Sequence, residues 1–237
     1  MEEIKIIYES PDFVVLNKPA GVLMHGVKIK SDKIREEPTL ADWITKKYPE
    51  IEKVGDDPKT RPGIVHRLDK ETSGVVVVAK TQEYFEYLKN LFGEKGIMKK
   101  YIALVHGEVK SDKGIIEKPI GIKSGTVKRT IHGGKMIKEA ITEYKVIKRY
   151  EGYTLLEASP KTGRTHQIRV HLASIGHPVV GDKLYGGKKE KRSLLKPERQ
   201  FLHAAEIKFE AKPGELVTFT APLPDDLTRL TKTLKSI

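Results

Sequence analysis

The chain of 237 residues contains no cysteine, one tryptophan and only 7% aromatic residues. The lack of cysteine excludes disulfides, thiolate nucleophiles and cysteine-ligated metals. No apolar run approaches the roughly 20 residues that cross a bilayer. The N-terminus MEEIKIIYES also lacks the basic-then-apolar order of a signal peptide. The sequence therefore predicts a protein that has no membrane span and stays in the cytoplasm.

Several catalytic signatures are missing as well. No stretch fits GxxxxGK[ST], a strand-linked GxGxxG or GxSxG, which argues against nucleotide-driven, dinucleotide and serine-hydrolase chemistry. The eight histidines are accompanied by neither HExxH nor an acidic calcium loop. We therefore expect no nucleotide cofactor and no metal ion.

Positive charge is in excess. The chain has 44 Lys and Arg against 32 Asp and Glu, a net charge of +12, which favours nucleic acid as a partner. Residues 121–149 hold eight basic residues against two Glu, and residues 182–199 hold seven against three acidic ones. Both stretches are predicted to contact phosphates, although a solvated lysine-rich surface explains each one equally well.

Short apolar runs separated by tight turns outnumber helical patterns, which predicts an α+β fold with a largely antiparallel sheet. One domain is expected over residues 1–237, because no repeat or low-complexity linker interrupts the chain. Thr39 and Thr81 are the expected N-caps of two helices, and Glu151 with Gly152 forms the turn of a hairpin. Strands or hairpins are expected at 4–21, 75–78, 99–109, 139–159, 201–210 and 216–220, and helices at 39–49, 81–92, 165–174 and after Pro224.

The stretch HRLDKETSG, residues 66–74, contains an arginine, an aspartate, a lysine and a glutamate just before the apolar run VVVVAK. Alone, such a cluster is typical of a solvated turn that precedes a buried strand. Thr72 and Ser73 suit that turn, and Gly74 would let the backbone bend. Function therefore has to be argued from further stretches.

Three stretches, HRLDKETSG, KKYIALVHG and GRTHQIRVH, resemble in this order the motifs of the RluA-type pseudouridine synthases. The flanks YESPDFVVLNKPAGVLMH and HLASIGHPVVGDKLYG extend the resemblance over most of residues 4–210, with MHG as a small departure from an MHP-like form. The resemblance implies isomerisation of uridine in RNA to pseudouridine without cofactor or metal. It also implies a mainly antiparallel mixed sheet with flanking helices and a central cleft. Longer members carry an N-terminal RNA-binding domain, which we expect this chain to lack.

By the resemblance, Asp69 is the catalytic aspartate, acting as nucleophile at the anomeric carbon or as base toward the 2′ position; the sequence leaves both routes open. Arg169 pairs with Asp69, and the ring of Tyr101 stacks on the uracil. Arg67 enters the space that the flipped nucleotide leaves. Without the motifs, Tyr101 would be interpreted as a core aromatic and Arg67 as a surface charge.

Further RNA contacts are assigned to His66, Arg164 and Ile168. Core packing explains Ile168 equally well. His66, together with His166 and Gln167, is also expected to hydrogen-bond the backbone and hold the motif loops.

Two other functions remain open at this point. The basic stretches could serve an RNA-binding or RNA-chaperoning protein, or Asp69 and Glu71 could be the paired carboxylates of a glycoside or nucleoside hydrolase. The expected partner is ribosomal or transfer RNA, the family usually acts as a monomer, and segments 28–38 and 186–200 are candidate substrate-reading loops.

Overall fold

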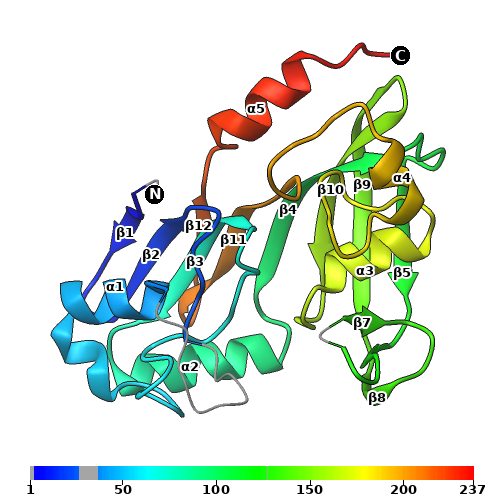
Figure 1. Cartoon of the computed structure of the whole chain (residues 1–237). Helices are drawn as coiled ribbons and strands as arrows, with labels where there is room; N and C mark the ends of the chain where they lie inside the picture. Colours follow the sequence, from blue (N-terminus) through cyan, green and yellow to red (C-terminus); the bar gives the residue numbers. More distant parts are fainter. Residues whose placement is uncertain (1–2, 27–36, 127) are drawn as a thin grey trace. The chain divides into compact units, whose positions relative to one another are not determined.

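The computed structural model describes residues 3–26, 37–126 and 128–237 of the chain (Figure 1). The chain divides into two compact units, Met1–Ile97 with Glu206–Ala221, and Met98–Ala205 with Pro222–Ile237. Most of the segment 28–38 lies outside the described residues. The single domain over residues 1–237 and its central cleft stay predictions.

The first unit is built on a sheet that begins with the N-terminal hairpin. Its strands follow the order β1–β2–β3–β11, and β12 pairs with β11. The strands are β1 Lys5–Glu9, β2 Phe13–Lys18, β3 Ser73–Ala79, β11 Leu202–Lys212 and β12 Glu215–Thr220; the helices are α1 Leu40–Lys47, the short 3-10 helix Pro49–Lys53 and α2 Gln82–Gly93. Strand β11 starts in the second unit and enters the first at Glu206.

Strand β3 is buried along its whole length, as the run of valines predicts. Helix α2 packs against it, and the ring of Tyr84 from α2 stacks on Phe13 of β2 at 4.9 Å between centroids. Gly74 has a φ of 118°, a conformation that favours glycine, which agrees with the predicted bend at the start of the strand.

In the second unit the strand order of this sheet continues as β11–β4–β10–β9–β5, and a separate small sheet has the order β7–β6–β8. Helix α3 packs against β9 and β10, and the core between them includes Leu104, Leu156, Leu172 and Phe201, all without exposed surface. The strands are β4 Met98–His106, β5 Lys113–Glu117, β6 Ile120–Ile122, β7 Arg129–Thr130, β8 Lys135–Lys138, β9 Ile141–Tyr150 and β10 Tyr153–Pro160; the helices are α3 Gln167–Ser174, α4 Gly187–Arg192 and α5 Asp225–Lys232.

The predicted α+β class is confirmed, and every strand pair with a resolved residue register is antiparallel. Both predicted N-caps are present: Thr39 Oγ1 accepts from the Asp42 N–H, and Thr81 Oγ1 from the Tyr84 N–H, each at 3.2 Å. Glu151 and Gly152 form the turn between β9 and β10.

Two local predictions need correction. The helix expected at 165–174 begins two residues later, at Gln167, because His166 has a φ of 58° and so lies outside helical geometry. The small sheet, β5 and α4 were not predicted at all. Among the described residues, every helix is too short or too polar to cross a bilayer.

Candidate active site

Asp69 lies in the first unit, in the turn that leads into β3. The Thr72 N–H donates to the Asp69 carbonyl at 3.0 Å and closes the turn. Leu68 is 4% exposed, whereas Arg67 is exposed and Asp69 is half-buried. Arg67 and Asp69 thus flank a buried residue in the segment that leads into β3.

A buried lysine that sequence reasoning missed fixes this turn. Lys18, the last residue of β2, has no exposed surface, and its Nζ donates to the carbonyls of Pro19 (2.8 Å), Val22 (2.9 Å) and Lys70 (3.1 Å). The Gly21 N–H donates to the same Lys70 carbonyl at 2.9 Å. Charge-assisted hydrogen bonds in a dry environment are strong, so Lys18 holds the residue that follows Asp69. The sequence feature that could have indicated this role is the lysine of NKPAG, a charged residue at the end of an apolar strand.

His66 also serves the loop. Its Nε2 accepts a hydrogen bond from the Val77 N–H of β3 at 3.0 Å, which places the ring proton of the neutral form on Nδ1. The ring stacks on Phe92 at 4.8 Å between centroids. These contacts agree with the predicted loop-holding role, and the RNA contact assigned to His66 stays a prediction.

Tyr101 lies on β4 in the second unit, opposite Ala158 of β10. It is half-buried and packs against the edge of the hydrophobic core. Lys99 points to the same face of β4, two residues away, and burial lowers its pKa to about 8. Lys99 and Tyr101 are both half-buried.

Arg169 is held by a carboxylate that the sequence analysis did not single out. Its Nε donates to Asp182 Oδ2 at 2.7 Å and its Nη2 donates to Oδ1 at 2.9 Å. The two side chains are 7% and 0% exposed. Asp182 Oδ1 also accepts from the N–H groups of Leu184 and Tyr185 at 2.9 and 3.0 Å. The guanidinium is thus locked in one orientation by a paired, fully buried anion.

The predicted pairing of Arg169 with Asp69 joins residues of the two different units, and it stays a prediction. Asp182 had a signal in the sequence, because it is the aspartate of GDKLYG within the stretch that carries the resemblance. Its role could not be derived from that signal alone.

The start of α3 is organised by Gln167, as the sequence predicted. Its Oε1 accepts from Thr162 Oγ1 (2.7 Å) and the Arg164 N–H (3.0 Å), and its Nε2 donates to the Ile141 carbonyl (2.9 Å) and Thr142 Oγ1 (3.0 Å). All four hydrogen-bonding positions of the amide are used. The loop before α3 is thereby fastened to the start of β9.

The remaining predicted RNA contacts differ in their surroundings. Ile168 is 6% exposed and belongs to the hydrophobic core of the second unit, which favours the packing role. Arg164 donates from Nε to the Glu139 carbonyl at 3.0 Å and is half-buried. Contact of either residue with RNA stays a prediction.

His171, one turn after Gln167, is a structural histidine. Its Nε2 lies 2.9 Å from the Lys118 carbonyl, and its Nδ1 lies 2.9 Å from Thr142 Oγ1. A carbonyl can only accept, so Nε2 carries the proton and Nδ1 accepts from the hydroxyl. Burial lowers the pKa of His171.

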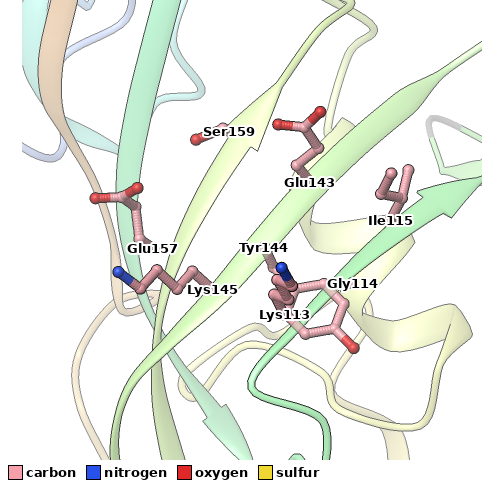
Figure 2. A pocket seen from close by; sticks show the side chains of 8 residues that line it. All are labelled: Lys113, Gly114, Ile115, Glu143, Tyr144, Lys145, Glu157 and Ser159. Carbon is pink, nitrogen blue, oxygen red and sulfur yellow. The ribbon is translucent and has the colours of Figure 1, made fainter.

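A hollow of about 550 Å³ lies on the sheet of the second unit, apart from these residues. Figure 2 shows its lining, to which β5, β9 and β10 contribute: Lys113, Gly114, Ile115, Glu143, Tyr144, Lys145, Glu157 and Ser159. None of the predicted site residues lines it. In the described parts of the chain, no three His, Asp or Glu side chains gather as a metal site would require.

Comparison with known proteins places the chain in a family. Residues 12–174 match the family described as RNA pseudouridylate synthase. An uncharacterised RNA pseudouridine synthase of Bacillus subtilis (strain 168) is 37% identical over 234 residues, which are 98% of this chain and 73% of the relative. A ribosomal large subunit pseudouridine synthase D of Vibrio cholerae is 37% identical over 98% of this chain and 71% of its own.

The fold agrees with this match. The structure of human RNA pseudouridylate synthase domain containing 1 superposes with a TM-score of 0.75 at 28% identity, covering 100% of this chain and 89% of that one. The match covers the HRLD turn, the β4 tyrosine and the HQIR helix start, whose geometry is described above. The chain therefore belongs to the RluA-type RNA pseudouridylate synthases, enzymes that isomerise uridine in RNA to pseudouridine.

Proposed function

We propose that this enzyme isomerises uridines of ribosomal RNA and that Asp69 is its catalytic carboxylate. Several relatives are named ribosomal large subunit pseudouridine synthase D, among them the Vibrio cholerae protein at 37% identity. The observation that carries the proposal is the placement of Asp69 in the turn that leads into the buried β3 and is held by Lys18. Transfer RNA is the second substrate class to be tested.

The reaction breaks the bond between N1 of uracil and C1′ of ribose, and the electron pair leaves with the base. In one route, a carboxylate oxygen of Asp69 bonds to C1′ and is later displaced by C5 of the rotated base. In the other, Asp69 removes a proton from C2′ and returns it when the bond between C5 and C1′ forms. Both routes end when C5 loses its proton to water and N1 takes up a proton, which restores the uracil ring.

The other site residues act around this carboxylate in our proposal. The guanidinium of Arg169 pairs with Asp69 and favours its ionised form. The ring of Tyr101 stacks on uracil. The exposed Arg67 fills the space left by the extruded nucleotide, whose unstacking costs a few kcal/mol. Family membership and the position of each residue in its motif support these roles.

The structure divides the basic stretches into paired and exposed cations. Arg149 bonds to Asp112 at 2.6 Å and to backbone carbonyls, and Arg199 pairs with Asp226 at 2.7 Å. By contrast, β8 is exposed at all four residues, including Lys135 and Lys138. The small sheet is therefore the better candidate for phosphate contact within residues 121–149.

Helix α4 offers a similar surface. Its cations Lys188, Lys189, Lys191 and Arg192 are exposed, whereas its one acid, Glu190, is turned inward. Glu190 Oε2 accepts from the Gly181 N–H at 2.8 Å and lies 2.9 Å from His106 Nε2. The carboxylate of Glu190 is thereby occupied by contacts within the unit. We propose that the exposed cations of α4 bind RNA phosphates.

The proposal also includes a monomeric enzyme that acts in the cytoplasm as a single catalytic domain over residues 1–237. Light scattering on the purified protein checks the oligomeric state, for which we expect a mass near 26.7 kDa. Fractionation of cells checks the location.

The decisive experiment uses ribosomal and transfer RNA tritiated at C5 of uridine. We expect wild type to release tritium to water from ribosomal RNA, Asp69→Asn to release none while still binding RNA, and Glu71→Gln to keep its activity. Glu71 is the matched control because it lies in the same turn. Activity of Asp69→Ala would refute the assignment. Release of free uracil by wild type, lost in both acid variants, would favour hydrolysis.

A further inference from the structure

Tyr185 lies in the turn that follows Asp182, and its ring supports Arg169. The guanidinium carbon of Arg169 is 5.2 Å from the centroid of the Tyr185 ring. The backbone N–H of Tyr185 donates to Asp182 Oδ1 at 3.0 Å, the same oxygen that binds Arg169 Nη2. Arg169 is thus held at its edge by a carboxylate and at its face by an aromatic ring, which attracts cations.

The hydroxyl group of Tyr185 makes two contacts on other elements. It accepts a hydrogen bond from the backbone N–H of Arg129 in β7 at 2.8 Å. It is also hydrogen-bonded to Nδ1 of His166 at 2.9 Å. His166 is the N-cap residue of α3, so one hydroxyl joins the small sheet to the start of the helix that carries Arg169.

The small sheet has a narrow attachment to the rest of its unit. The hydrophobic cluster beneath it consists of three buried residues, Ile120, Ala140 and Val170, with Ile131 and Tyr185 packed against them. So small a cluster provides little burial energy, and each polar contact at its edge has a correspondingly larger share in fixing the sheet. The bond from Arg129 to Tyr185 is such a contact.

We propose that Tyr185 is a positioning residue with two separable roles. Its ring orients Arg169 for the reaction, and its hydroxyl sets the position of the basic small sheet against the start of α3. RNA phosphates bound by the sheet and the arginine of the active site then keep a fixed geometry within the second unit. The inference rests on the proposed function, in which Arg169 acts at the site and the small sheet contacts RNA.

The two roles predict different kinetic effects for two substitutions. Tyr185→Phe keeps the ring and removes the hydroxyl, so we expect RNA to bind about fivefold more weakly while bound RNA reacts at nearly the wild-type rate. Tyr185→Leu removes the ring as well, and bound RNA should then react about tenfold more slowly than with Tyr185→Phe. Tyr87→Phe is the matched control, because its half-buried hydroxyl makes one hydrogen bond, to the Glu210 carbonyl at 3.0 Å, and lies in the first unit.

The experiment measures single-turnover release of tritium and RNA affinity, both corrected for the folded fraction of each variant. A readout that does not depend on activity is added by NMR. In Tyr185→Phe, the Arg129 amide should exchange with solvent faster while the Arg169 Nε–H signal is retained; in Tyr185→Leu, the latter should shift or broaden. These signals report on Tyr185 even if wild type fails to isomerise ribosomal RNA, an outcome that would count against the proposed function alone.

Wild-type affinity and rate in Tyr185→Leu would overturn the inference. Equal losses in both Tyr185 variants and in Tyr87→Phe would overturn it too, because they would mean a general loss of stability. A split between affinity and rate, with Tyr87→Phe unaffected, is the result that supports it.

Discussion

Replacement of Asp182 by Asn is the most informative test of how Arg169 is held. The carboxylate is fully buried and accepts four hydrogen bonds, two from Arg169 and one each from the N–H groups of Leu184 and Tyr185. The asparagine oxygen can keep the two backbone donors. Its NH₂ group would then face the Nε–H of Arg169, so that a donor meets a donor beside an uncompensated buried cation.

The expected loss of stability follows from this geometry. Removal of one partner of a buried ion pair costs about 3–5 kcal/mol. For a chain of this size, 1 kcal/mol corresponds to about 2–4 °C, so the melting temperature should fall by roughly 6–20 °C. In the folded fraction, a displaced Arg169 should slow isomerisation by about 100-fold.

The second unit supplies a matched control in the pair of Arg199 and Asp226. It has the same two-point geometry, with distances of 2.7 and 3.1 Å, but the Asp226 side chain is 41% exposed. Asp226→Asn should therefore cost about 1 kcal/mol or less and leave activity unchanged.

Urea denaturation and single-turnover tritium release on both variants provide the comparison. If Asp182→Asn were as stable as Asp226→Asn and reacted at the wild-type rate, the argument that Asp182 positions Arg169 would be wrong.

Three further predictions concern other contacts. Lys18→Met leaves three carbonyls without their buried cation and should lower the free energy of unfolding by about 3 kcal/mol, which chemical denaturation measures; an unchanged midpoint would contradict it. Burial lowers the pKa of His171, so the unfolded state takes up more protons and stability should fall as pH drops below about 6.5, by at most about 1.4 kcal/mol per pH unit. Melting curves at several pH values should show this slope in wild type and a smaller one in His171→Gln. The double variant Lys188→Glu/Lys191→Glu should reduce the slope of log Kd against log salt by about 1.5, whereas Lys46→Glu on α1 should not change it.

Much of the fold follows from the sequence because burial and capping decide it locally. The run of valines in β3 is buried at every position, and Thr39 and Thr81 cap their helices as their positions indicate. The start of α3 did not follow, because the left-handed conformation of His166 accompanies a contact with Tyr185, 19 residues away. Local propensity carries no information about such a contact.

The site divides in the same way. Motif resemblance identified Asp69, Tyr101 and Arg169 as candidates but not the groups that hold them. Arg169 and Asp182 are separated by 13 residues, and Lys18 and the Lys70 carbonyl by 52. Neither pairing has a periodicity that a sequence would reveal.

The order of strands in the first unit has a consequence for synthesis of the chain. Strand β3 has β11 as its neighbour, yet Met98–Ala205 must be translated between the two parts of this unit. At about 5–20 residues per second, the partner of β3 follows only after on the order of 10 s. During that interval the valine-rich β3 lacks one neighbour and presents an open edge, the kind of surface on which nascent chains aggregate. The first unit is consequently completed only after the second has left the ribosome almost entirely.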